Sequence, residues 1–437
     1  MKSFNLLTSL RTLRTFSGVF ALASSISVVS FATQAETLAI INAEIHTVAE
    51  QGVLSQGAVL VENGKITAVY ANDQIPLQLI ADKVIDAKGG VLTPGIIASN
   101  NTLGLVEVGA VSRTRDSADK KADITFDASL AFNPKSSLIP YARKGGITSS
   151  IVMPSGGEGV FSGQSFIVNL SAGFDSVIVS QHAVIADFGA KSKGSRAVNL
   201  QTFSNALEDA SKTLAKDKKA KEKKEPKDKK EAKEPTRAQK VINAVVKGEK
   251  TLLAHADRAT DILVLLALKK KYQLDLVLVG ASDAILVADE IAQADVVVMT
   301  NALANLPTSF DSLHSSLSNV AQLQKAGVRV IISNSGESYN INQLRFDAGV
   351  AVANGLAKTD ALAAITANVA DAFKLNSGRI AVGKNADLVL WSNDPFEISS
   401  KVNALWINGQ AVTTQSRQDA LRNRYTSKSE LPRAYIK

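Results

Sequence analysis

The chain of 437 residues contains no cysteine and only four histidines, His46, His182, His255 and His314. Without cysteine the protein forms no disulfide and carries no lipid-modified cysteine, so an oxidising compartment is compatible with the sequence but is not indicated by it. The histidines are scattered along the chain. A site with several imidazole ligands would therefore have to draw on almost every histidine present.

Long apolar runs are also absent, with one exception at the start of the chain. Residues 15–32 carry no charge, follow three basic residues and precede a small-residue segment that ends at Ala35. This order is typical of a signal peptide, so we predict cleavage of residues 1–35, a mature chain that begins at Glu36, and a periplasmic location. An uncleaved anchor is the alternative, but the run is short for a membrane span. We predict no stable membrane span after cleavage.

The sequence indicates no extended basic surface despite the net charge of +8, because the excess of basic over acidic residues is concentrated in short segments. Residues 212–240 hold twelve lysines and one arginine against six acidic residues. With the basic N-terminal segment they account for the excess, so nucleic-acid binding is not predicted. This lysine-rich segment lacks aromatic residues and is interrupted by Pro226 and Pro235. We interpret it as a solvated, partly helical insertion, with a binding tail or basic scaffold as the alternative.

Strand-like segments occur at both ends of the remaining chain. Residues 37–93 are rich in valine and isoleucine with turn residues between the runs, and residues 385–392 and 402–412 have the same character. We predict a small β-sandwich built from both chain ends, residues 36–93 and 377–415, followed by a C-terminal tail over residues 416–437.

The middle of the chain alternates apolar strand runs with helical stretches, most regularly over residues 250–372. Such alternation indicates parallel β/α units. We therefore predict an α/β protein with a (β/α)8 TIM-like barrel over residues 94–376, while a doubly wound sheet remains the alternative.

Several segments resemble one known family. They are VLTPGII (residues 91–97), GGIT (145–148), SGQ (162–164), HADRATDI (255–262) and GRIAVGKNADLV (378–389). The last, followed by a strand, a tryptophan and Asp394-Pro395, is the most specific. Over residues 37–415 the chain resembles the amidohydrolase family, in its imidazolonepropionase-like branch. The resemblance implies a hydrolase of non-peptide carbon–nitrogen bonds, such as those of cyclic amides, with one or two divalent metals at the barrel mouth.

The family's metal ligands can be sought position by position. Where the family places His-x-His, this chain has Asn100-Asn101-Thr102, and the sixth-strand histidine and eighth-strand aspartate match Gly280 and Ser335, or Asn334 if the match shifts by one residue. The fifth-strand histidine is retained as His255. A conventional binuclear centre would need all four histidines of the chain. We predict a degenerate metal site that holds at most one divalent metal and no other cofactor.

His255 has two interpretations, a hydrogen-bonded structural histidine or a member of a site. In the second, it binds one metal or forms a metal-free acid/base pair with Asp257 or Asp261, although Asp261 also suits a helix cap or salt bridge.

The glycine-containing segment 153–164 is a flexible loop or lines a ligand pocket through Glu158 and Gln164. Two functions follow from the sequence: a surviving hydrolase with one metal or none, or a non-catalytic periplasmic protein that binds a small molecule or partner at the barrel mouth.

Overall fold

The computed structural model describes residues 37–76, 79–189, 194–222, 234–334 and 338–427. The expected signal peptide, Ser335 and the centre of the lysine-rich segment lie outside these ranges. Among the described helices, none combines the length and the hydropathy required to cross a bilayer.

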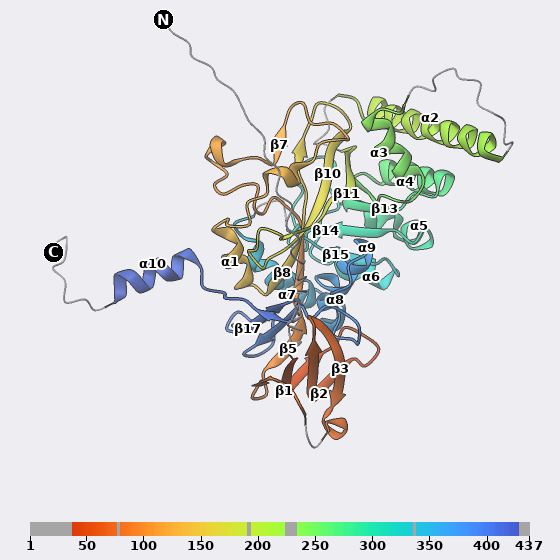
Figure 1. Ribbon diagram of the computed structural model, residues 1–437. Helices are drawn as coiled ribbons and strands as arrows, with labels where there is room; N and C mark the ends of the chain where they lie inside the picture. Colours follow the sequence, from red (N-terminus) through yellow and green to blue (C-terminus); the bar gives the residue numbers. More distant parts are fainter. Residues whose placement is uncertain (1–36, 77–78, 190–193, 223–233, 335–337, 428–437) are drawn as a thin grey trace, which may run out of the picture. The chain divides into compact units, whose positions relative to one another are not determined.

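The two ends of the chain build one eight-stranded sheet, here called the terminal sheet (Figure 1). Its strands are β1 (Thr37–His46), β2 (Val53–Glu62), β3 (Lys65–Ala71), β4 (Lys83–Asp86), β5 (Val91–Pro94), β16 (Leu388–Trp391), β17 (Val402–Ile407) and β18 (Gln410–Ala411). The strand β16 joins the two ends, because it pairs antiparallel with both β5 and β17. The shared sheet was expected from the sequence, whereas its arrangement as a two-layer sandwich stays a prediction.

A second eight-stranded sheet, the barrel sheet, occupies the middle of the chain in the order β15-β14-β13-β12-β11-β10-β8-β6. Its strands are β6 (Ile96–Asn101), β8 (Ile147–Val152), β10 (Phe161–Asn169), β11 (Val177–Asp187), β12 (Leu252–Ala256), β13 (Leu276–Gly280), β14 (Val297–Thr300) and β15 (Val330–Ile332). All neighbours are parallel except at β10, which runs antiparallel to both β8 and β11. The uniform β/α alternation predicted for the barrel is therefore broken at this one strand.

The barrel sheet is strongly curled. Side chains from its first and last strands, Ile97 and Ile331, belong to one apolar cluster together with side chains from every strand between them. In the described chain no strand pairing joins β6 to β15, and the backbone N–H of Ile97 donates instead to the carbonyl of Ile365 at 2.9 Å. The sheet thus encloses an apolar interior in the manner of a barrel.

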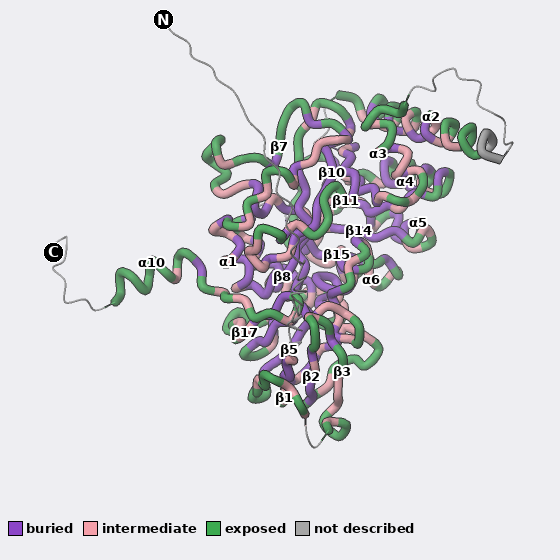
Figure 2. The backbone as a smooth tube through the Cα atoms, in the orientation of Figure 1, coloured by how far each residue is buried: buried purple, intermediate pink, exposed green. Residues whose placement is uncertain are grey.

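Helices follow the strands and pack on the outer face of the barrel sheet (Figure 2). They are α1 (Leu138–Arg143), α2 (Arg196–Glu222), α3 (Arg237–Val246), α4 (Ala259–Tyr272), α5 (Ala288–Gln293), α6 (Asn319–Lys325), α7 (Leu344–Ala353) and α8 (Lys358–Ala364). The helix α9 (Ala367–Ala372) contributes instead to the apolar cluster inside the curled sheet, and α10 (Arg417–Thr426) has no buried residue. The start of α3 is set locally by a capping box, in which Thr236 and Gln239 satisfy each other's backbone N–H groups.

The two sheets meet where the two most specific sequence motifs touch. The backbone N–H of Gly95 donates to the carbonyl of Asp387 at 2.8 Å. A Cβ atom added at Gly95 would lie 2.1 Å from the Thr148 hydroxyl oxygen, so only glycine fits at this junction. The motifs at residues 91–97 and 378–389 are therefore parts of one packed contact, which positions the first barrel strand.

Candidate active site

A cavity of about 500 Å³ opens where strands β6, β8, β11 and β12 end. It is lined by Asn100, Asn101, Thr102, Ala118, Asp119, Lys120, Met153, Pro154, Ser155, Gly156, Gly157, Ile185, Asp187 and His255. This is the carboxyl end of the parallel strands, where the active sites of α/β barrels lie. Three residues singled out from the sequence, Asn100, Thr102 and His255, are thus brought together.

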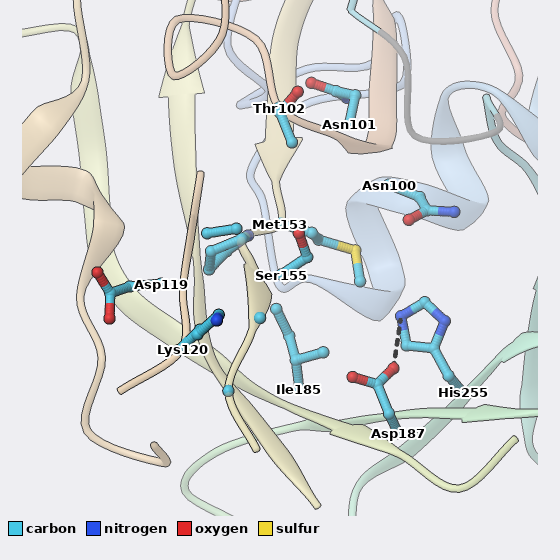
Figure 3. A pocket seen from close by; sticks show the side chains of 14 residues that line it. Asn100, Asn101, Thr102, Asp119, Lys120, Met153, Ser155, Ile185, Asp187 and His255 are labelled. Atoms are coloured by element: carbon cyan, nitrogen blue, oxygen red, sulfur yellow. Dashed lines mark ion pairs between the residues drawn. The ribbon is translucent and has the colours of Figure 1, made fainter. Parts of the chain in front are cut away.

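Asp187 and His255 lie together as an acid–histidine pair at one end of this cavity (Figure 3). They face each other in the parallel register of β11 and β12, and His255 Nε2 lies 3.9 Å from Asp187 Oδ1. Both side chains are largely buried, at 16% and 15% exposure. The hydroxyl of Ser162 donates to the other carboxylate oxygen of Asp187. At this separation, which is longer than a hydrogen bond, the carboxylate can stabilise the protonated form of the imidazole through its charge.

The residues at the end of β6 present neutral groups to the cavity. Asn100 adopts a left-handed backbone conformation with φ 55°, which asparagine tolerates better than most residues. Its side-chain amide donates to the carbonyl of Asn334 at 3.3 Å, and the hydroxyls of Thr102 and Ser338 lie 3.0 Å apart. These polar side chains are tied to the chain segment that follows β15.

Gly280 ends β13 with φ 82°, and a Cβ atom built there would lie 2.8 Å from Asp257 Oδ1. The Asp257 carboxylate occupies this space and accepts hydrogen bonds from the hydroxyl and the backbone N–H of Ser282. Neither Gly280 nor Asp257 lines the cavity. Asp257 is therefore placed beside His255 along the chain but not at the cavity wall.

A hydrolytic zinc-type centre requires at least three histidine or carboxylate ligands. Only the Asp187–His255 pair offers such donors at one point of the cavity, since the other positions expected to hold ligands carry amide or hydroxyl groups or no side chain. Within the described ranges, no three histidine, aspartate or glutamate side chains are placed to hold a metal. The residues present do not fit the metal centre that the resemblance implies, and we assign no catalytic step to a metal.

The wall opposite Asp187 and His255 is a short ribbon of two strands, β7 (Ala118–Asp119) and β9 (Ser155–Gly156). Figure 3 shows Lys120 and Asp119 on the other side of Ile185 from Asp187 and His255. The Asp119 carboxylate points away from the pair and accepts the backbone N–H of Lys121 at 2.7 Å.

Three other candidates lie elsewhere. Glu158 and Gln164 do not line the cavity, and Gln164 is buried at 1% exposure. Asp261 forms an ion pair with Arg196 at 3.4 Å, and burial raises its pKa. Asp261 therefore forms a salt bridge, which the sequence offered as the alternative to an acid/base role beside His255.

The remaining histidines are also separate from the cavity. His46 lies on β1 in the terminal sheet, and His314 pairs with Asp283 at 2.8 Å in the loop before α6. His182 lies within β11, and its ring centre is 5.8 Å from that of Phe373.

Sequence reasoning missed Asp187, the partner of His255. The signal was present, because the apolar run AVIA of residues 183–186 ends in this acidic residue, as expected for a residue at the end of a buried strand. It also missed Asp347 on α7, a carboxyl at 7% exposure whose pKa burial raises to about 7. Nothing in the helical sequence around Asp347 marks it as buried beside Asn334.

A curled α/β sheet with a polar cavity at its strand ends is a barrel-type scaffold, here joined to an accessory sheet from both termini. The amidohydrolase family model matches residues 139–412, more than half of the chain. The chain belongs to the amidohydrolase family.

Individual relatives agree with this assignment. The chain is 22% identical over 394 residues to the amidohydrolase tasK of Hapsidospora irregularis, and the match covers 81% of this chain but 40% of that protein. An amidohydrolase structure from Thermotoga maritima MSB8 has a TM-score of 0.77 and 24% identity, covering 86% of this chain and 99% of that one. A zinc-bound adenosine deaminase from Xanthomonas campestris has a TM-score of 0.51 and 18% identity, covering 89% and 99%. At these identities the two structures establish the fold alone, and the branch within the family stays a prediction.

Proposed function

We propose that the protein hydrolyses non-peptide carbon–nitrogen bonds, such as those of small cyclic amides, in the cavity beside His255. The observation that carries this proposal is the cross-strand pair of Asp187 and His255, largely buried at the edge of a cavity of about 500 Å³. A cavity of this size suits a small molecule.

The chemistry assigned to the pair is general acid–base catalysis. The neutral imidazole of His255 removes a proton from water, and the resulting hydroxide attacks the carbonyl carbon of the amide. The carbon–nitrogen bond then breaks, and the imidazolium returns its proton to the leaving nitrogen. Asp187 stabilises the imidazolium through its negative charge while the ring carries the proton.

We further propose that the metal site of the family is degenerate in this chain. Asn100, Thr102 and Gly280 stand at positions where the resemblance places histidines, and the expected aspartate matches Ser335 or Asn334. Neutral oxygens with one imidazole and one carboxylate bind a zinc-type ion weakly.

The decisive experiment is a hydrolysis assay of the purified protein against a panel of five- and six-membered cyclic amides, before and after dialysis against a chelator. We expect turnover that survives the chelator and falls by about 100-fold or more in His255→Ala. His46→Ala is the control, because His46 pairs with Glu44 in the terminal sheet and not with the cavity. Binding of the amides without turnover would favour a non-catalytic binding protein instead.

We also propose that the protein acts in the periplasm after removal of residues 1–35, on the order of basic, apolar and small residues at its start. Intact-mass measurement of the protein from its native host tests this point. A chain that begins at Glu36 is expected, and recovery of chains with Met1 from membranes would indicate an anchor.

A further inference from the structure

A second cavity, of about 630 Å³ and here called the outer groove, lies between α2 and α3, which pack against each other (Figure 1). Its floor is apolar and is formed by Phe161 at the start of β10, by Ala210 on α2 and by Ile242 on α3. None of its lining residues also lines the cavity beside His255. The outer groove is therefore a separate place in the molecule.

The sequence of α2 directs one face of this helix into the outer groove. Ala206, Ala210, Thr213 and Asp217 all line it and recur at intervals of three or four residues, so they share one face of the helix. Opposite them, α3 contributes Ala238. The alanines present only methyl groups to the space between the two helices, which leaves room for a bound molecule.

The rim of the outer groove is acidic. Asp209 and Asp217 on α2 and Glu234 before α3 line it, and all three residues are exposed. Among the described residues, no lysine, arginine or histidine lines the groove. Glu234 pairs with Lys240 at 2.6 Å, so Asp209 and Asp217 supply most of the charge for a ligand. Carboxylates above an apolar floor favour a cation that has an apolar body and repel an anion.

The floor of the outer groove is continuous with the packing behind His255. The ring of Phe161 packs edge-to-face on Phe203 of α2 with 6.0 Å between ring centres, and Phe203 packs in the same way on Phe188 at 5.2 Å. The backbone N–H of Phe188 donates to the carbonyl of His255 at 2.8 Å. Three aromatic side chains thus connect the groove with the backbone of His255.

A second connection runs along β10 to Asp187. Ser162 follows Phe161 in the chain, and its hydroxyl donates to the Asp187 carboxylate. On the other side of Phe161, the carbonyl of Val160 accepts the backbone N–H of Asp187 at 2.8 Å. Because Phe161 lies between the two residues that hold Asp187, a ligand that displaces Phe161 also displaces contacts of the carboxylate.

We propose that the outer groove binds a small organic cation with an apolar body, such as an aryl-alkyl ammonium ion, and that this ligand changes the environment of the Asp187–His255 pair. A cavity of about 630 Å³ suits a molecule of this size. The ammonium group is placed at Asp209 and Asp217, and the apolar body on Phe161. Binding and coupling are both independent of the proposed hydrolysis, and each can be measured without turnover.

Titration calorimetry of the full chain tests the recognition, with 2-phenylethylammonium, the uncharged 2-phenylethanol and the anionic 3-phenylpropionate as probes. We expect the ammonium ion to bind about 10-fold more tightly than the alcohol, and the anion to bind more weakly than either. The preference should narrow as the salt concentration is raised. Asp209→Asn combined with Asp217→Asn should reduce it to less than about 3-fold. Glu208→Gln is the matched control, because Glu208 neighbours Asp209 on α2 but does not line the groove, and it should keep the full preference.

Nitrogen-15 NMR of the histidine side chains tests the coupling, with the His255 signal assigned from its loss in His255→Gln. Saturation with 2-phenylethylammonium should move the His255 signal and leave that of His46, in the terminal sheet, in place. The movement should be lost in the double variant of Asp209 and Asp217. Equal binding of the ammonium ion and the alcohol, or a preference that survives the double variant, overturns the assigned site. Binding in the groove with an unmoved His255 signal overturns the coupling. Failure to hydrolyse cyclic amides would alter neither readout.

Discussion

At the scale of single residues, the site depends on a partnership between two side chains that are distant in sequence. Asp187 ends β11 and His255 lies near the end of β12, so the parallel pairing of these strands places them opposite each other. His255 was visible in the sequence as a histidine at a strand end. Its carboxylate partner was not, because the choice between Asp187, Asp257 and Asp261 depends on which strands are neighbours.

The first prediction concerns Asp187→Asn. We expect this change to lower the turnover number by about 100-fold with little effect on KM, because asparagine keeps the shape but cannot stabilise an imidazolium. Steady-state kinetics on the best cyclic amide measures it. Asp123→Asn is the control, since Asp123 caps an exposed turn outside the cavity. An unchanged turnover number in Asp187→Asn would show that the pair is structural.

The second prediction concerns Asp347, whose pKa burial raises from 3.8 to about 7. In the unfolded chain the carboxyl ionises first, so the native state loses stability as the pH rises from about 4 to about 7 and no further above that range. Asp347→Asn removes this loss. Relative to wild type, the free energy of unfolding of Asp347→Asn should increase by about 2 kcal/mol between pH 4 and pH 7.5. This value lies below the upper limit of about 1.4 kcal/mol for each unit by which the pKa is raised.

Urea unfolding at several pH values between 4 and 8 measures the effect of Asp347→Asn. The exposed Asp289 on α5 provides the control, and Asp289→Asn should leave the pH dependence of stability unchanged. A variant of Asp347 whose pH dependence equals that of wild type would show that this carboxyl ionises normally in the native state.

At the scale of elements, one buried carboxylate connects several segments at the barrel mouth through hydrogen bonds. Asp311, at 5% exposure, lies in the loop of residues 301–318 between β14 and α6. It accepts hydrogen bonds from Arg196 at the start of α2 and from Arg258, which precedes α4, at 2.6 Å for the latter. Because α2 and α4 follow the strands of Asp187 and His255, Asp311 connects three segments around the site.

The third prediction is that Asp311→Ala lowers the free energy of unfolding by about 3 kcal/mol, because it leaves two arginines beside a buried position without their shared partner. Chemical denaturation measures this loss. Asp295→Ala is a matched control, since Asp295 also pairs with an arginine, Arg329 at 2.8 Å, but is 81% exposed. An exposed pair contributes about 0.5 kcal/mol. Equal losses in the two variants would contradict the assigned role of Asp311.

The order of helices and strands was largely predictable from the sequence, but the direction of one strand, β10, was not. The apolar runs over residues 250–372 predicted β12 to β15 and the helices between them, because each run is bounded by turn residues. The strand β10 was not expected to run antiparallel, since periodicity identifies a strand but carries no information on its direction.

At the scale of the whole molecule, the fourth prediction concerns metal content. Protein purified from its host without added metal should contain far less than one tightly bound zinc, iron or manganese ion per chain, because Asp187 and His255 are too few ligands for a stable centre. Elemental analysis on a desalted sample measures it. One or two ions per chain that are lost in His255→Ala would restore a metal-dependent mechanism, and ions that survive this change would place a site elsewhere.

The sequence by itself indicated the family, an α/β scaffold and the joining of the two chain ends, because these depend on local patterns such as apolar runs and the motifs around Gly95 and Asp387. Only the tertiary structure decided which side chains share the cavity. Asp187, His255 and Lys120 come from three separate segments. The pairing of β11 with β12 and of β7 with β9 brings them to the same cavity. The physical reason is that side-chain chemistry is encoded residue by residue, whereas proximity depends on the register and order of strands that only packing selects.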